Sequence, residues 1–68
     1  MHLKTYLESR NLDQSEFANM IGVTPVAISN YVCKKRLPSL KIGRMIEIAT
    51  RGKVKIDDLI EFFEKKED

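Results

Sequence analysis

The chain has 68 residues, of which 43% are hydrophobic and 32% are charged. This balance is typical of a folded globular protein and excludes the low hydrophobicity and high charge of a disordered chain. A chain of this length buries only about 60% of the surface that it exposes when unfolded. We therefore expect one domain over residues 1–68 with a small core.

The rare residue types exclude several sources of stability and function. Cys33 is the only cysteine, so no internal disulfide can form, and we expect it to be semi-exposed without a redox role. His2 has no neighbouring ligand for a metal site, and we expect it to be solvated. The sequence has neither a signal-peptide pattern nor an apolar run long enough to span a membrane, which predicts a cytoplasmic protein without membrane contact.

Charge is distributed unevenly along the chain. Residues 24–55 contain eight lysines and arginines but a single acidic residue, Glu47. Residues 56–68 contain six acidic residues and two lysines, and residues 1–23 contain three acidic and two basic residues. The basic centre is the segment that a polyanion would meet.

Hydrophobic spacing and capping patterns predict two helices near the start of the chain. Apolar residues recur at i, i+3 and i+4 and predict a first helix over about residues 2–10. Asp13, followed three residues later by Glu16, has the pattern of an N-cap with its capping-box partner. This pair predicts a second helix over about residues 14–21.

The next three residues predict a turn and a further helix start. Gly22 follows the second helix at the position where the chain needs a positive φ. Thr24 can cap a third helix, and Pro25 suits its first position because proline lacks the N–H that would be unbonded there. We expect this helix to extend to about Cys33.

The second half of the chain predicts two more helices. Pro38 ends the preceding segment, and Ser39 can cap a fourth helix over about residues 40–50, which Gly52 would end. Residues 53–56 alternate between basic and apolar and predict an extended connector.

We expect Val54 and Ile56 of this connector to enter the core and Asp57 to cap a fifth helix. The acidic residues that follow suit the first turns of an exposed helix, where the helix dipole favours them. The helix has more apolar residues than one face can bury, and they serve either as core or as a dimer contact: Leu59, Ile60, Phe62 and Phe63.

Residues 14–33 contain a helix, a glycine turn and a second helix, which is the strongest motif in the sequence. Two closely crossing helices need a small residue such as Ala18 at their contact. The expected core positions of the motif are Phe17, Ile21, Val23, Ile28 and Tyr31. The outer face of the second helix carries small or amide side chains that let a helix lie deep in a DNA groove: Thr24, Pro25, Val26, Ser29, Asn30 and Cys33.

This motif and its basic flank resemble the helix-turn-helix proteins of the Cro and lambda-repressor type, from Leu3 to about Phe63. Lys35-Arg36-Leu37-Pro38, and Gly52-Lys53-Val54 leading into Asp58-Leu59, are similar to small phage Cro repressors and YdaS-like regulators. Lys34 stands where such proteins often have a glycine. The resemblance implies an all-α, five-helix, lambda-repressor-like DNA-binding domain whose helix-turn-helix is formed by the second and third helices.

The resemblance also implies two sets of DNA contacts. The residues expected to face bases are Pro25, Val26, Ser29 and Asn30. The residues expected to contact phosphates are Gln14, Thr24, Lys34, Lys35 and Arg36. Simpler alternatives remain at this point, since Asn30 could be an exposed surface amide and the three cations a solvated loop.

The sequence thus predicts a sequence-specific regulator of transcription that acts as a Cro-like phage or prophage repressor. Its partner would be a pseudo-palindromic operator in double-stranded DNA, bound by a homodimer that is weak or forms only on DNA. The alternative is an antitoxin-like protein-interaction module whose acidic, aromatic last helix binds another protein. No nucleophile constellation or phosphate-binding loop occurs, so we expect neither an enzyme nor a cofactor.

Overall fold

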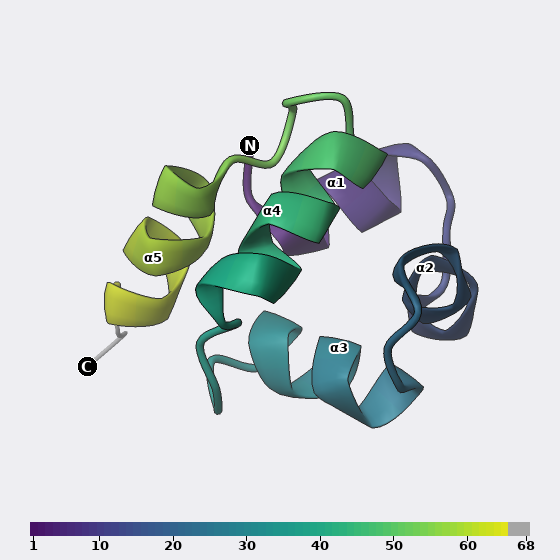
Figure 1. Ribbon diagram of the computed structural model, residues 1–68, viewed down its shortest axis with the longest axis horizontal. Helices are drawn as coiled ribbons and strands as arrows, with labels where there is room; N and C mark the ends of the chain where they lie inside the picture. Colours follow the sequence, from purple (N-terminus) through teal and green to yellow (C-terminus); the bar gives the residue numbers. More distant parts are fainter. Residues whose placement is uncertain (66–68) are drawn as a thin grey trace.

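The structure is a computed structural model that describes residues 1–65. These residues form five short helices and contain no strand, which confirms the expected all-α class (Figure 1). The helices are α1 (Leu3–Ser9), α2 (Gln14–Ile21), α3 (Pro25–Val32), α4 (Leu40–Ala49) and α5 (Ile56–Glu64).

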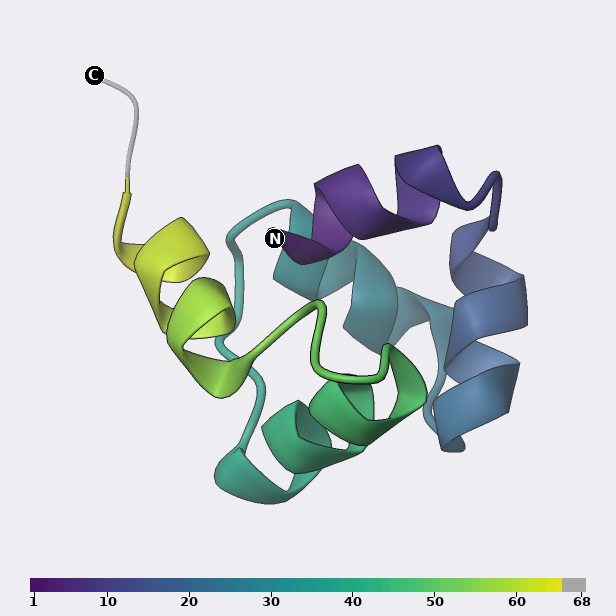
Figure 2. The same ribbon diagram turned by 90° about the horizontal axis from the view of Figure 1, so that it is seen from above.

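Helix α2 lies at one end of the molecule and α5 at the other, and α3 runs between them (Figures 1 and 2). Helix α4 packs against both α2 and α5 and so connects the two ends. The start of the chain lies near α5, although the two segments are the most distant in the sequence (Figure 2). Met1 and His2 can therefore contact residues of α5.

Three helices begin where the sequence predicts, because a side chain satisfies a backbone N–H that the first turn leaves free. The Asp13 carboxylate accepts from the Glu16 N–H at 2.7 Å, and the Glu16 carboxylate accepts from the Asp13 N–H at 3.3 Å. The hydroxyl of Thr24 accepts from the Ala27 N–H at 3.2 Å. Ser39 caps α4 in the same way. The predicted starts of α2, α3 and α4 are therefore confirmed.

The core takes side chains from all five helices and from the turn between α4 and α5. Its largest fully buried hydrophobic side chains are Phe17, Ile28, Ile46 and Val54. The predicted core positions Phe17, Ala18, Ile21 and Ile28 are confirmed as buried, whereas Val23 and Tyr31 are half-buried and pack against the core from its edge. Burying a large aliphatic or aromatic side chain contributes about 1.5–3 kcal/mol, so these few residues supply much of the stability of so short a chain.

The predicted cap of the last helix is wrong. Helix α5 begins at Ile56, one residue before the expected cap Asp57, and Lys55 is its N-cap. The Asp58 carboxylate, at the third position of the helix, accepts from the Lys55 N–H at 3.0 Å. Asp58 thus satisfies this donor from inside the helix, and the Glu47 carboxylate of α4 accepts from the next N–H, that of Ile56, at 3.4 Å.

A tight turn precedes the connector that was expected to be extended over residues 53–56, and that expectation holds only in part. Residues 53 and 54 form a bend, Lys55 is extended, and Ile56 already belongs to α5. Helix α4 ends at Ala49, and both Arg51 and Gly52 have positive φ. The buried Thr50 hydroxyl donates to the Glu47 carbonyl at 3.2 Å and accepts from the Val54 N–H at 3.1 Å. This hydroxyl holds the turn closed and lets Val54 enter the core. Ile56, expected in the core as well, is half-buried.

The N-terminal residues bind α5. The Met1 ammonium donates to Asp58 Oδ2 at 2.8 Å, and Asp58 also accepts from the backbone. The expectation that His2 is solvated is wrong, because its Nε2 lies 3.0 Å from Glu61 Oε1 and its ring packs on Phe62 with centroids 5.0 Å apart. These contacts join the two ends of the sequence and fix the position of α5.

Candidate nucleic-acid interface

The turn between α2 and α3 sets the direction in which α3 leaves the core. Gly22 has φ +75°, a left-handed conformation that favours glycine. The Gly22 and Val23 N–H groups both donate to the Ala18 carbonyl, which ends α2. Ala18 is 1% exposed and its small side chain allows the two helices to approach closely. Helix α3 therefore crosses α2 with one face in the core and the opposite face in solvent.

The outer face of α3 is accessible along its first two turns. Val26 is 67% exposed, and Thr24 and Pro25 are also exposed. Ser29 and Asn30 are half-buried, while Ile28 on the opposite face is fully buried. The residues predicted to face bases are thus brought together on one surface. This surface has small or flexible side chains and carries no charge.

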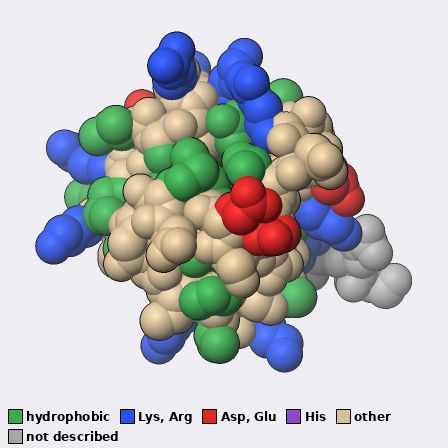
Figure 3. Space-filling model, turned by 90° about the vertical axis from the view of Figure 1, so that its right-hand side faces the viewer, with side chains coloured by type: hydrophobic (Ala, Val, Ile, Leu, Met, Phe, Trp, Pro, Cys, Tyr) green, Lys and Arg blue, Asp and Glu red, His purple; other side chains and the backbone are tan. Residues whose placement is uncertain are grey.

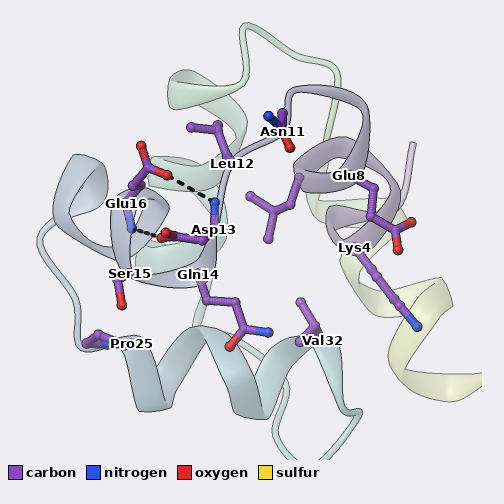
Figure 4. Close-up of a pocket in the computed structure, with 11 residues that line it drawn as sticks. Lys4, Glu8, Asn11, Leu12, Asp13, Gln14, Ser15, Glu16, Pro25 and Val32 are labelled. Atoms are coloured by element: carbon purple, nitrogen blue, oxygen red, sulfur yellow. Dashed lines mark hydrogen bonds between the residues drawn. The ribbon is translucent and has the colours of Figure 1, made fainter.

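An open cleft of about 860 Å³ lies beside this surface, between α1, the start of α2 and α3 (Figure 4). Gln14 extends from the first position of α2 toward α3, and Pro25 lines the other end of the cleft (Figure 4). A predicted phosphate contact and a predicted base contact therefore share one cleft. Lys4 of α1 lines it as well and was not predicted, since at the level of sequence it is one more exposed residue of an amphipathic helix.

The cleft is not uniformly basic. Three carboxylates line it, of which Asp13 and Glu16 are engaged in the capping box of α2 and Glu8 lies on α1. The face that contains α2 accordingly shows acidic side chains near its centre and lysine or arginine around its edge (Figure 3). Besides Lys4, the cations nearest to the α3 face lie in the segment that follows α3.

That segment contains three consecutive cations with different surroundings. Lys34 has φ +61°, so a lysine adopts the left-handed conformation that a glycine takes more easily. Its Nζ lies 4.7 Å from the centroid of the Phe62 ring and donates to the Lys65 carbonyl. Lys35 and Arg36 are exposed and form no ion pair within residues 1–65. Lys35 and Arg36 are therefore available to phosphates, whereas the Lys34 ammonium is held on α5.

Cys33 and Thr24 lie at the two ends of α3. Cys33 is exposed at the C-cap of α3, as the sequence predicts. The Thr24 hydroxyl accepts from the Ala27 N–H and so defines the start of α3. Thr24 is exposed at the edge of the same surface.

No helix among the described residues is long and apolar enough to cross a membrane.

A family model for helix-turn-helix domains matches residues 3–59, which include α1 to α4 and the start of α5. The chain therefore belongs to the Cro/C1-type helix-turn-helix family, and its fold is the lambda-repressor-like fold of that family. It is a DNA-binding transcription regulator whose partner is double-stranded DNA. Comparisons with curated proteins and with solved structures gave no match.

Proposed function

We propose that this regulator is a Cro-like phage or prophage repressor that binds a pseudo-palindromic operator as a homodimer. One observation carries the proposal: the exposed face of α3 has small and amide side chains, and the loop after it presents Lys35 and Arg36, which form no ion pair within residues 1–65. Such a helix fits the major groove while the cations after it bind the flanking phosphates. A repressor bound in this way at a promoter blocks RNA polymerase from binding there.

Base recognition in this proposal is the role of four residues on α3. Pro25 and the exposed Val26 suit the methyl group of thymine, and the amide of Asn30 can bond both N6 and N7 of adenine. Ser29 can donate or accept and so fits several bases. This set favours recognition of A·T pairs in each half-site.

Phosphate binding is the role of the surrounding residues. Gln14 and Thr24 lie at the starts of α2 and α3, where free backbone N–H groups favour an anion. Lys35 and Arg36 supply charge from the loop after α3. In this proposal Lys34 binds a phosphate only when its ammonium leaves the Phe62 ring.

Dimerisation follows from the size of the site that one copy can bind. A single α3 reads only a few base pairs, and two copies related by a two-fold axis read half-sites about 34 Å apart along the duplex. The dimer is weak in solution or forms only on DNA in this proposal, because a domain of this size has a limited apolar surface to spare.

The first test is selection of bound fragments from a random duplex library, followed by binding of the selected DNA and of scrambled DNA at several salt concentrations. An enriched palindrome is the expected result. Binding that is indifferent to sequence and no tighter than about 10⁻⁴ to 10⁻⁶ M at physiological salt would contradict the proposal. It would favour instead a protein-interaction module of the antitoxin type, with α5 as its contact surface.

Two variants then separate base contacts from phosphate contacts. Asn30→Ala is expected to lose about 1–3 kcal/mol of binding free energy and to relax specificity at one base pair. Asn19→Ala on α2 is the matched control, because it removes an exposed amide outside α3.

Lys35→Ala is expected to weaken binding to all DNA sequences similarly and to reduce the salt dependence of binding. Lys53→Ala is its control, because it removes a cation from the distant α4–α5 turn.

A further inference from the structure

The loop after α3 begins with a lysine at a position that usually holds glycine. Lys34 has φ +61° and follows the C-cap of α3. Its N–H donates to the Tyr31 carbonyl at 3.3 Å, and the Lys35 N–H donates to the Asn30 carbonyl at 2.9 Å. These two bonds form a Schellman cap, in which the left-handed position is most often glycine. A long side chain is thus present where the backbone would fold more easily without one.

A second turn in the molecule adopts the same backbone although its left-handed side chain makes no such contacts. Arg51 has φ +55°, and its N–H donates to the Ile48 carbonyl at 3.1 Å. The Gly52 N–H donates to the Glu47 carbonyl at 2.8 Å. The Arg51 guanidinium has no ion pair or aromatic contact within residues 1–65. The Lys34 ammonium can therefore leave its partners without opening the loop.

The partners of the Lys34 ammonium belong to α5 and to the residue after it. Its Nζ lies 4.7 Å from the centroid of the Phe62 ring, which is within the range of a cation–π contact, and donates to the Lys65 carbonyl. The same ring packs on His2 with centroids 5.0 Å apart, so a second segment of the chain also holds it in place. Lys34 is half-buried, whereas the two cations that follow it are exposed.

We propose that Phe62 is a positioning residue for DNA binding, which holds the Lys34 ammonium away from phosphates and so lowers the affinity for every DNA sequence. Lys34 lies between α3 and the two cations proposed to bind phosphates, so its side chain starts beside the same phosphates. Phosphate contacts carry no sequence information, which is why the effect extends to all sequences. The inference rests on the proposed function, because it needs a DNA strand next to the end of α3.

The ring and a phosphate compete for one cation on nearly equal terms. An exposed cation–π contact and one phosphate contact at physiological salt each change an equilibrium by less than about tenfold. Low salt favours the phosphate, because binding then gains more from the release of counterions. High salt leaves the ammonium on the ring of Phe62. The ring thus reduces the gain from the Lys34 contact without abolishing it.

The test is binding of the full chain to a short duplex with one selected half-site, and to a scrambled duplex of the same length, over a series of salt concentrations. Phe62→Leu keeps the apolar bulk but removes the aromatic face. It should raise the affinity for both duplexes about twofold to fivefold. The slope of log K against log salt should steepen by up to about 0.9, the value for one more phosphate contact.

Two further variants control for changes in α5. Phe62→Tyr keeps an aromatic ring and should restore the affinity and slope of the wild-type chain. Phe63→Leu is the matched control, because Phe63 is the next residue of α5 and is also half-buried, whereas the Lys34 ammonium lies on the ring of Phe62. Phe63→Leu should leave the slope unchanged. Thermal unfolding checks that each variant folds.

A change at Lys34 itself isolates the cation. In the Lys34→Gln chain, Phe62→Leu should no longer change the DNA affinity, because the cation that it releases is absent. Lys34→Gln alone should weaken binding and flatten the slope less than Lys35→Gln does, because the held ammonium contributes less than the exposed one. This last comparison leaves α5 unaltered and so does not depend on the folding of the Phe62 variants.

Three results would overturn the role of Phe62. They are unchanged or weaker DNA binding by folded Phe62→Leu, a gain that persists in the Lys34→Gln chain, and equal losses in Lys34→Gln and Lys35→Gln. Weaker binding by Lys35→Gln would in that case leave the proposed phosphate contacts of the loop intact. Preference for the selected over the scrambled duplex tests the proposed function separately, so the two failures can be distinguished.

Discussion

The half of the molecule formed by α2 and α3 and the half formed by α4 and α5 are built by different kinds of interaction. In the first, each helix end is defined by residues within four positions of it: Asp13 with Glu16, Gly22 with Ala18, and Thr24 with Ala27. In the second, α5 packs on α4 and is also contacted by Met1, His2 and Lys34, which are between 28 and 60 positions away from their partners on it.

The difference explains what each half can do. Local caps and the glycine turn define where α2 ends and where α3 begins, which suits a surface that must match DNA. Helix α5 packs on α4 through the buried Leu59 and Gly43, and its remaining ties to the chain are exposed contacts, each worth about 1 kcal/mol or less. The α4–α5 half is thus the easier one to perturb without loss of the DNA-reading surface, and three substitutions test this contrast.

The largest effect is expected at Gly43, which is buried between α4 and α5. A Cβ there would lie 3.2 Å from Ile56 Cγ1 and 3.7 Å from Leu59 Cδ1. Gly43→Val should therefore force α5 away from α4 and lower the free energy of unfolding by about 1–3 kcal/mol, measured by urea titration. Gly43→Ala is the control, because its close contact is offset by a gain of about 1 kcal/mol in helix propensity. A valine variant as stable as the alanine one would show that the helices separate freely.

The matching change in the first half is Gly22→Ala. Nothing lies within 4 Å of a Cβ at this position, so the cost comes from the left-handed backbone alone. A loss of roughly 1–2 kcal/mol is expected by the same titration. Gly22→Asn should lose less, since asparagine adopts this conformation more easily than alanine does. Equal losses in the two variants would mean that the backbone conformation is not the cause.

The smallest effect is expected at Asp58 and depends on pH. The hydrogen bond from the Met1 ammonium, and after it the bond from the Lys55 N–H, lowers the pKa of Asp58 below its ordinary value of 3.8. A depressed pKa stabilises the folded state fully above the ordinary value, and this stabilisation is lost as the pH falls through the folded-state pKa. Asp58→Asn should therefore cost below about 1 kcal/mol at neutral pH, since the pair is partly exposed.

The difference in unfolding free energy between the wild-type chain and Asp58→Asn should close on acidification. The control is acetylation of Met1, which removes the ammonium charge. Acetylated wild-type chain should lose part of the same stability, and the asparagine variant should then cost less than before. A gap that stays constant down to strongly acidic pH would contradict the assigned pairing.

The sequence predicted the first half of the molecule closely because its signals are local. The starts of α2 and α3 and the turn at Gly22 depend on caps and on φ preferences that neighbouring residues reveal, and the start of α4 at Ser39 was predicted in the same way. The second half was predicted less well. The roles of Thr50, which closes a turn, and of Gly43, which contacts α5, depend on which segments lie next to each other in the folded chain. The sequence alone does not reveal those neighbours.

The candidate site shows the same limit. The sequence brought the residues of the α3 face together correctly, because helical spacing alone places them on one side. It gave Lys34, Lys35 and Arg36 the same role, since they are consecutive cations. The structure distinguishes them by the aromatic ring of Phe62, which approaches Lys34 only because α5 folds back beside the end of α3.

The ion pair between the Met1 ammonium and Asp58 also has a practical consequence for anyone who produces the protein. An amino-terminal purification tag converts that ammonium into a neutral amide and places extra chain against α5. Such a tag is therefore expected to loosen the contact between the start of the chain and α5 while leaving the rest of the fold intact. Measurements on α5 should be made on protein whose tag has been removed to leave Met1 as the first residue.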